Sequence, residues 1–245
     1  ENIYFGMAAV NARGSEEVIP VFSLSRQEFL EYDVTKAIYS LNLDTKPIVG
    51  IISPLKIEGE APPQSMFGAA SEPEPWIMVS QMSQVAEVSF IKPEEKTIDQ
   101  GIKTLYVIHP RKLSPDMPYA IDQFVMRGGN LFGAIDPFCH VDQPDNANGQ
   151  DPTAAMTYDH SSNLAELLTK WGVEMVPKKV VGDGNIATKV NVNRQGVPQE
   201  FLLWLTLEKA NDLAKDTLNK DDILTGQLNS VLLTWAGALK KKDVE

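Results

Sequence analysis

The sequence predicts an α/β protein: a Rossmann-like three-layer domain with a mostly parallel sheet, plus a β-rich C-terminal part. Two observations support this fold class. Short apolar runs, each ended by proline, alternate with amphipathic helical segments, as expected when crossover helices join parallel strands. Beyond residue 180 the helical periodicity gives way to strand-like alternation. A chain of 245 residues is long enough for one large domain, or for a domain with a small appendage.

The first segment, residues 1–25, is expected to form an N-terminal β-hairpin that packs on the core or on the C-terminal part. β-Branched and aromatic residues cluster at 3–10 and 17–22, and a turn-like stretch separates them.

The Rossmann-like α/β core is assigned to residues 26–176. Ser25 and Glu28 have the spacing of a capping box. Apolar residues at helical spacing follow them, so a helix is expected near 26–42.

Three buried strands are expected in this core, with a further short strand at 87–91. Continuous apolar runs are typical of strands covered by helices on both faces. Each run is stopped by a proline, and the three runs are 47–53, 104–109 and 131–136.

Three further helices are expected to cover this sheet. One spans 75–85. The second opens at Ser114 with Pro115 in its first turn, and Gly128 closes it in the left-handed conformation. The third is capped by Ser161 or Ser162 and ends at Gly172.

Residues 177–245 are expected to form a β-rich C-terminal extension or subdomain. Alternating or apolar segments at 188–192, 200–207 and 228–239 indicate strands.

Composition excludes several classes of partner and cofactor. A net charge of −11 and the lack of a basic stripe argue against nucleic acid. The nearest approach to a nucleotide fingerprint is Gly182-Asp-Gly184, where the third glycine is replaced by Ala187. No cofactor is therefore expected, and no apolar run is long enough to span a membrane.

The most enzyme-like stretch is Asp136-Pro-Phe-Cys139-His140, just beyond a strand end. A thiol nucleophile needs an exposing turn and a base at hydrogen-bond distance, but no nucleophile elbow surrounds Cys139. His109, His140 and His160 could converge with Asp136 or Asp142 on a metal, although their spacing does not show it. We predict no catalytic residue and no metal site. A Cys- or metal-dependent hydrolase is the alternative.

Binding residues are predicted at the carboxyl ends of the buried strands, where open α/β sheets place their ligands. The predicted ligand or partner residues are Ser53, His109 and Asp136, together with His140. The two longest irregular segments, 54–74 and 137–160, leave from the same rim, and long loops on a rigid scaffold often carry binding residues.

Several strings, taken in order, resemble the gliding-motility-type auxiliary proteins of ABC transport systems, the GldG family. The α/β domain of that family is related to one in intraflagellar-transport proteins. The strings extend along nearly the whole chain and include Glu17-Val-Ile-Pro-Val-Phe22, Lys46-Pro-Ile-Val-Gly-Ile-Ile-Ser53, Tyr119-Ala-Ile-Asp-Gln-Phe-Val-Met-Arg-Gly-Gly129, Ile135-Asp-Pro137, Trp171-Gly-Val173 and Val180-Val-Gly-Asp183.

The resemblance implies a non-catalytic, extracytoplasmic domain on the periplasmic side. It implies anchoring to the inner membrane through flanking helices that lie outside this sequence, beside ABC permease and ATPase subunits. A glycan, a peptide or an envelope protein is the expected ligand. The core of the family is similar to the class I glutamine-amidotransferase fold, but the resemblance supplies no catalytic residues.

Overall fold

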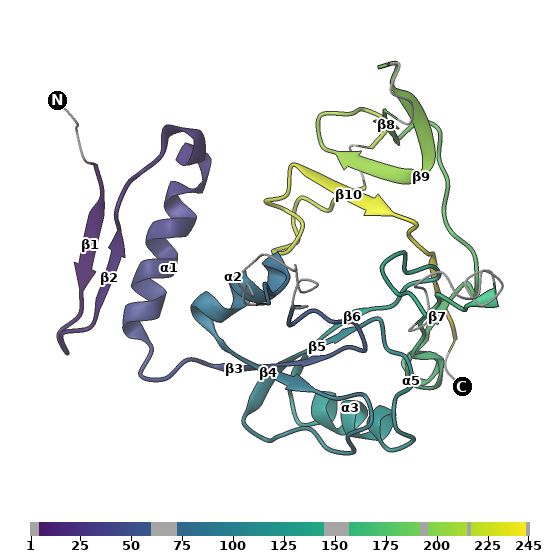
Figure 1. Ribbon diagram of the computed structural model, residues 1–245, viewed down its shortest axis with the longest axis horizontal. Coiled ribbons are helices and arrows are strands. Elements are labelled where there is room, and N and C mark those ends of the chain that lie inside the picture. The colour runs from purple at the N-terminus through teal and green to yellow at the C-terminus, as the bar shows by residue number, and fades with distance from the viewer. Residues whose placement is uncertain (1–4, 60–72, 145–156, 192–195, 215–216, 244–245) are drawn as a thin grey trace, which may run out of the picture.

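A computed structural model describes residues 5–59, 73–144, 157–191, 196–214 and 217–243. Figure 1 shows the arrangement of the elements. The helical elements are η1 (Leu24–Phe29), α1 (Leu30–Asn42), α2 (Ile77–Val85), α3 (Met117–Met126) and α5 (Ala165–Lys170). The strands are β1 (Met7–Val10), β2 (Glu16–Ile19), β3 (Ile48–Ile52), β4 (Glu87–Ile91), β5 (Ile102–Ile108), β6 (Asn130–Ala134), β7 (Val173–Met175), β8 (Ala187–Val190), β9 (Gln199–Glu208), β10 (Ser230–Thr234) and β11 (Leu239–Lys241).

A four-stranded sheet lies at the centre of the fold, in the order β4-β3-β5-β6. All three of its strand pairs are parallel, so the prediction of a parallel sheet among helices is confirmed. β3 lies inside the sheet, and its residues Val49 to Ile52 are buried. Gly50 suits this position, because a Cβ there would meet the side chains of Ile102 and Leu105 at 3.0 Å.

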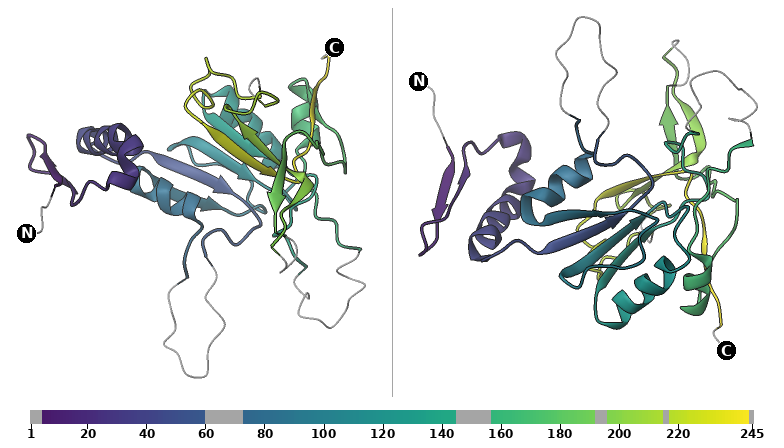
Figure 2. Two further views of the ribbon diagram at one scale, coloured as in Figure 1. Left: turned by 90° about the horizontal axis from the view of Figure 1, so that it is seen from above. Right: turned by 60° about the horizontal axis from the view of Figure 1, so that its bottom comes forward.

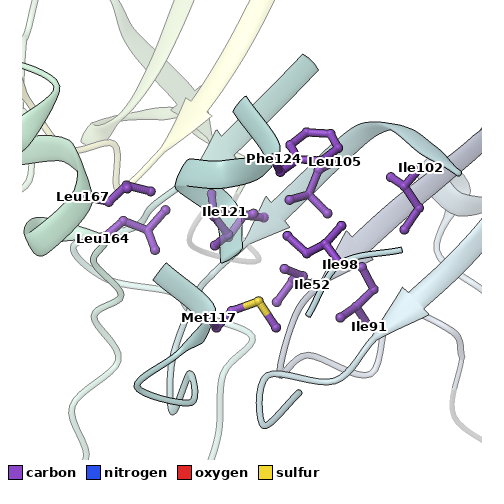
Figure 3. Packing of buried hydrophobic residues seen from close by; sticks show 11 residues of the cluster. Ile52, Ile91, Ile98, Ile102, Leu105, Met117, Ile121, Phe124, Leu164 and Leu167 are labelled. Atoms are coloured by element: carbon purple, nitrogen blue, oxygen red, sulfur yellow. The ribbon is translucent and has the colours of Figure 1, made fainter. Parts of the chain in front are cut away.

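The two faces of this sheet are covered by different helices. Alternate residues of β5 point to opposite faces, as in any strand. Leu105 and Val107 join the larger apolar cluster, which contains Phe124 of α3 and Leu167 of α5, and Figure 3 shows how that cluster packs. Tyr106 and Ile108 pack instead against the cluster that contains Val79 of α2. The core is therefore a sheet between two helical layers.

The helix starts differ from the predicted ones. Ser25 lies inside η1, and α1 begins only at Leu30. Ser114 and Pro115 precede α3, which begins at Met117. Ser162 lies before α5, whose N-cap is Leu164. The predicted left-handed residue at the end of α3 is confirmed, since Gly128 has a φ of 88°.

The C-terminal part is rich in strands, as predicted. β8, β9 and β10 form an antiparallel sheet in the order β10-β9-β8. β11 pairs with β7, which immediately follows α5. The last strand, β11, therefore pairs with a strand on the other side of the boundary predicted at residue 176. The division of the chain into domains stays a prediction.

The N-terminal hairpin also forms, with β1 and β2 antiparallel. It contacts α1, and the side-chain amide of Asn11 donates to the carbonyl of Leu41 at 2.8 Å. The hairpin and α1 lie at one end of the molecule, beside α2 (Figure 2). None of the helices in the described ranges is both long enough and apolar enough to cross a membrane.

Candidate functional site

The carboxyl ends of β5 and β6 carry the polar residues of the candidate site. The two strands are parallel neighbours, with Ile108 opposite Ala134. The main-chain N–H of His109 donates to the carbonyl of Ala134 at 2.8 Å, which extends the ladder by one bond. His109 and Asp136 therefore follow the sheet on the same rim.

Asp142 is the centre of a hydrogen-bonded network on this rim. Its Oδ2 lies 3.0 Å from Nε2 of His109 and forms a close ion pair with Arg111. Its Oδ1 accepts the hydroxyl of Tyr158 at 3.0 Å. Burial by itself would raise the pKa of Asp142. Hydrogen bonds from His109, Arg111 and Tyr158 outweigh that effect and hold the pKa below its usual value of 3.8.

His109 is fixed in an unusual conformation at the base of the network. Its side chain is only 2% exposed, and its φ of 49° is left-handed. One ring nitrogen, Nε2, faces the carboxylate of Asp142, and the other, Nδ1, has no hydrogen-bond partner among the described residues. Such backbone strain and unsatisfied polarity are found more often at functional sites than elsewhere.

Asp136 joins the rim to the segment that precedes α5. Its main-chain N–H donates to Ser162 Oγ at 2.9 Å, and its carbonyl accepts the N–H of Ser162 at 2.8 Å. Its carboxylate accepts the N–H of Phe138 at 2.9 Å. Burial raises the pKa of Asp136, and the bond from Phe138 and the nearby His109 reduce the shift.

The thiol of Cys139 is buried, with 7% exposure. Burial is the main reason that its pKa is raised, which lowers the population of the reactive thiolate. Its main-chain N–H donates to the carbonyl of His160 at 2.8 Å. This geometry disfavours Cys139 as a nucleophile. Within the described ranges, no group of three or more His, Cys, Asp or Glu residues could hold a metal ion.

A cleft of about 390 Å³ opens beside this network, which we call the rim cleft. It is lined by Pro137, Phe138, Thr157, Tyr158, Asp159, His160, Lys178, Val180 and Trp235. Its walls come from both the rim loops and the C-terminal part. Gly237 permits this junction, because a Cβ there would lie 3.0 Å from the ring of Pro137.

Aromatic contacts connect the cleft to both parts of the molecule. Phe138 packs against His160 and Trp235, with ring centroids 4.9 Å and 6.1 Å away. Trp235 contacts Trp204 of β9 edge to face, at 5.6 Å. Tyr158 lies under the guanidinium of Arg111, 4.8 Å from its ring. The cleft therefore lies at the junction between the α/β core and the β-rich part.

Comparison with known proteins identifies the family. Residues 46–245 match the family described as "ABC-type uncharacterized transport system". The chain belongs to this ABC transport auxiliary family. A protein of Borreliella burgdorferi, named only as an uncharacterized protein, is 23% identical over 244 residues, which cover 98% of this chain and 43% of the relative. The chain thus spans less than half the length of that relative. No solved structure matches it.

In this auxiliary-family chain, the four predicted binding residues occupy different positions. His109 and Asp136 follow the neighbouring strands β5 and β6 and lie on the same rim. His140 is exposed and stacks on Trp235, with an interplanar angle of 6°. Ser53 caps its own loop, where its Oγ accepts the N–H of Leu55 at 3.1 Å. A binding role for these four residues stays a prediction.

Other residues of the site were not predicted from the sequence. Arg111 stands two residues after His109 in the sequence, a position that could have placed it on the rim. Tyr158 and Lys178 carry no periodic signal, and Trp235 comes from a distant strand end. Residues 60–72 of the predicted binding loop 54–74, and residues 145–156 of the loop 137–160, lie outside the described residues.

Proposed function

We propose that this chain is a non-catalytic, extracytoplasmic domain of a gliding-motility-like ABC transport auxiliary protein, and that it binds a ligand or an envelope partner at the rim. Family membership gives the chain an auxiliary role associated with an ABC transport system. The observation that carries the binding proposal is the rim cleft, where an aromatic wall adjoins the buried network of Asp142. Ligand sites commonly form at such junctions between parts of a protein.

The chemistry of the rim supports binding in place of catalysis. His109 is buried, and the half-buried Asp142 is already paired with both His109 and Arg111. The thiol of Cys139 is buried, and its raised pKa keeps it protonated. These paired and protonated side chains stabilise the loops of the rim. They offer no activated nucleophile to a substrate.

We further propose that the core is Rossmann-like. The strand order β4-β3-β5-β6 supports this. The second strand of the sheet, β4, lies on one side of β3, and the next two, β5 and β6, lie on the other side. In such sheets, ligands bind beyond the carboxyl ends of the strands. The rim cleft lies beyond β6, to one side of the point where the order reverses.

The proposed partners are the permease and ATPase subunits of the same system, with the chain on the periplasmic side of the inner membrane. A glycan, a peptide or an envelope protein would be its ligand. These proposals rest on the family and on the resemblance to GldG proteins, since the chain covers 43% of its longer relative.

Site-specific photo-crosslinking in native membranes tests this function. A photoreactive amino acid would replace Val141, which is 56% exposed on the rim loop, or Val18, which is 54% exposed on the N-terminal hairpin. We expect the full-length protein to form crosslinks to transport-system or envelope components from position 141. The matched position 18 should form none.

A second variant separates binding from folding. Asp136→Ala removes the carboxylate that holds the N–H of Phe138 and should weaken the crosslinks from position 141 at an unchanged thermal midpoint. The proposed binding surface would be wrong if position 141 formed no crosslinks, or if Asp136→Ala left them at full strength.

A further inference from the structure

We propose that the rim cleft binds a neutral sugar ring of a glycan, stacked on Phe138 and hydrogen-bonded by Asp159 and Lys178. This inference names the ligand class of the proposed binding function, on which it rests. It comes from the lining of the cleft, which combines one available aromatic face with a paired donor and acceptor.

Phe138 is the ring with an available face. It is 37% exposed, and it is tilted by 40° from His160 and by 41° from Trp235, so neither ring stacks flat on it. By contrast, His140 stacks on Trp235, and Arg111 covers Tyr158. The negative face of an aromatic ring attracts the positive C–H edge of a flat-lying ring, which a sugar presents along its axial hydrogens.

Asp159 and Lys178 supply the polar part of the cleft. The ammonium of Lys178 lies 3.4 Å from Oδ2 of Asp159. The other carboxylate oxygen is held by the hydroxyl and the N–H of Ser161, at 2.6 Å and 3.0 Å. Ser161 first, and then Lys178, lower the pKa of Asp159 to about 2, so the carboxylate is ionised at neutral pH.

This pair selects hydroxyl groups over charged groups. A carboxylate only accepts hydrogen bonds and an ammonium only donates them, whereas each hydroxyl does both. Two neighbouring hydroxyls therefore satisfy the pair together. Asp159 would repel an anionic ligand, and Lys178 would repel a cationic one. The cleft therefore favours a ligand without net charge.

The cleft is preorganised and of suitable size. Lys178 and Trp235 both have left-handed backbones, with φ of 51° and 49°, and the N–H of Trp235 donates to the carbonyl of Leu203 at 2.9 Å. Strained residues of this kind persist only where the surrounding structure fixes them. The volume of about 390 Å³ lies at the lower end of ligand pockets, which measure ~300–1,000 Å³.

The main chain around the cleft argues against a peptide ligand. Peptides that bind by strand addition need free main-chain N–H and C=O groups. Among the residues that line the cleft, the N–H of Phe138 donates to the carboxylate of Asp136 at 2.9 Å, the carbonyl of His160 accepts the N–H of Cys139 at 2.8 Å, and the N–H of Trp235 donates to Leu203. These main-chain groups are already paired, which leaves polar recognition to the side chains of Asp159 and Lys178.

Isothermal titration calorimetry of the 245-residue chain with cellotriose, N,N′,N″-triacetylchitotriose and hexaalanine tests this proposal. We expect saturable binding of at least one trisaccharide and none of the peptide. Phe138→Ala should weaken trisaccharide binding by about tenfold. Phe132→Ala, which removes a ring that is 51% exposed on β6 and outside the cleft, should leave it unchanged.

Lys178→Asn gives an independent variant, because asparagine tolerates the left-handed backbone while the ammonium is lost. We expect it too to weaken trisaccharide binding. The proposal is overturned if neither trisaccharide binds, if hexaalanine binds in their place, or if Phe132→Ala weakens binding as much as Phe138→Ala. Crosslinks from position 141 would still report the proposed function in each of these cases.

Discussion

At the scale of single residues, Asp142 holds the rim together. It connects the end of β5, through His109 and Arg111, to Tyr158, which lies 16 residues further along the chain. A half-buried carboxylate with three partners loses stability when those partners are removed. The charge of Asp142 thus determines the shape of the rim beneath the cleft.

The acid stability of the protein should depend on Asp142. Its pKa is below the usual 3.8, so the unfolded chain binds this proton more readily than the folded one. The stabilisation is complete above about pH 4 and is lost as the pH falls through the lowered pKa. Asp142→Asn should lower the thermal midpoint at about pH 7. It should also reduce the further loss of thermal stability as the pH falls below about 4, as measured by scanning fluorimetry.

Asp116→Asn is the control for this experiment. Asp116 forms an exposed pair with Lys96 at 3.3 Å, and such pairs contribute little stability. An acid transition of Asp142→Asn with the same slope as that of the unaltered protein would contradict the assigned role.

At the scale of elements, the end of α3 shows two different uses of glycine. Gly128 has a left-handed φ of 88°, and open space surrounds the position of its missing Cβ. Gly129 has no such φ, but a Cβ there would clash with the ring of Phe124, which is fully buried. Gly128 allows the left-handed backbone at the end of α3, and Gly129 leaves room for the ring of Phe124.

Alanine substitutions should separate these two effects. Gly128→Ala should lower the free energy of unfolding by about 1 kcal/mol, through backbone strain alone. Gly129→Ala should cost more, ~1–3 kcal/mol, because it displaces a core ring. Urea denaturation would measure both variants. Equal losses would show that the ring of Phe124 moves away freely and that the packing described for α3 is incorrect.

At the scale of the whole molecule, the N-terminal unit is set apart from the core. Among the described residues that precede residue 46, only Ala37 is buried. The hairpin and α1 expose large apolar side chains, including Leu24 at 90% and Phe5 at 66%. The main apolar clusters all lie further along the chain.

A chain of residues 46–245, the same range that matches the family, should therefore fold without the N-terminal unit. Its thermal midpoint in calorimetry should stay within a few degrees of that of the full 245 residues, because almost no buried apolar area is removed. A dispersed amide NMR spectrum would confirm the native fold. Loss of cooperative unfolding would show that the hairpin and α1 contribute to the core.

Local sequence patterns were sufficient to locate the main strands of the sheet. Apolar runs ended by proline located β3, β5 and β6. Only β3 is buried along almost its whole length, as a strand covered on both faces requires. The prediction that the third run is also buried is wrong, because β6 is the edge strand of the sheet and its residues are exposed or half-buried. The rule that strand ends meet on one rim placed His109 beside Asp136. Tertiary structure decided the helix starts, because serine hydroxyls found distant partners: Ser114 donates to the carbonyl of Glu95, and Ser162 accepts the N–H of Asp136.

The site itself depended on tertiary structure to a greater degree. Asp142, Tyr158 and Trp235 come from irregular segments or from a strand end of the C-terminal part. The fold brings these distant segments together through hydrogen bonds and ring packing. Contacts of this kind leave no periodic pattern in the sequence. The strand rule could therefore place the rim, but only the folded chain could bring the aromatic wall of the cleft against it.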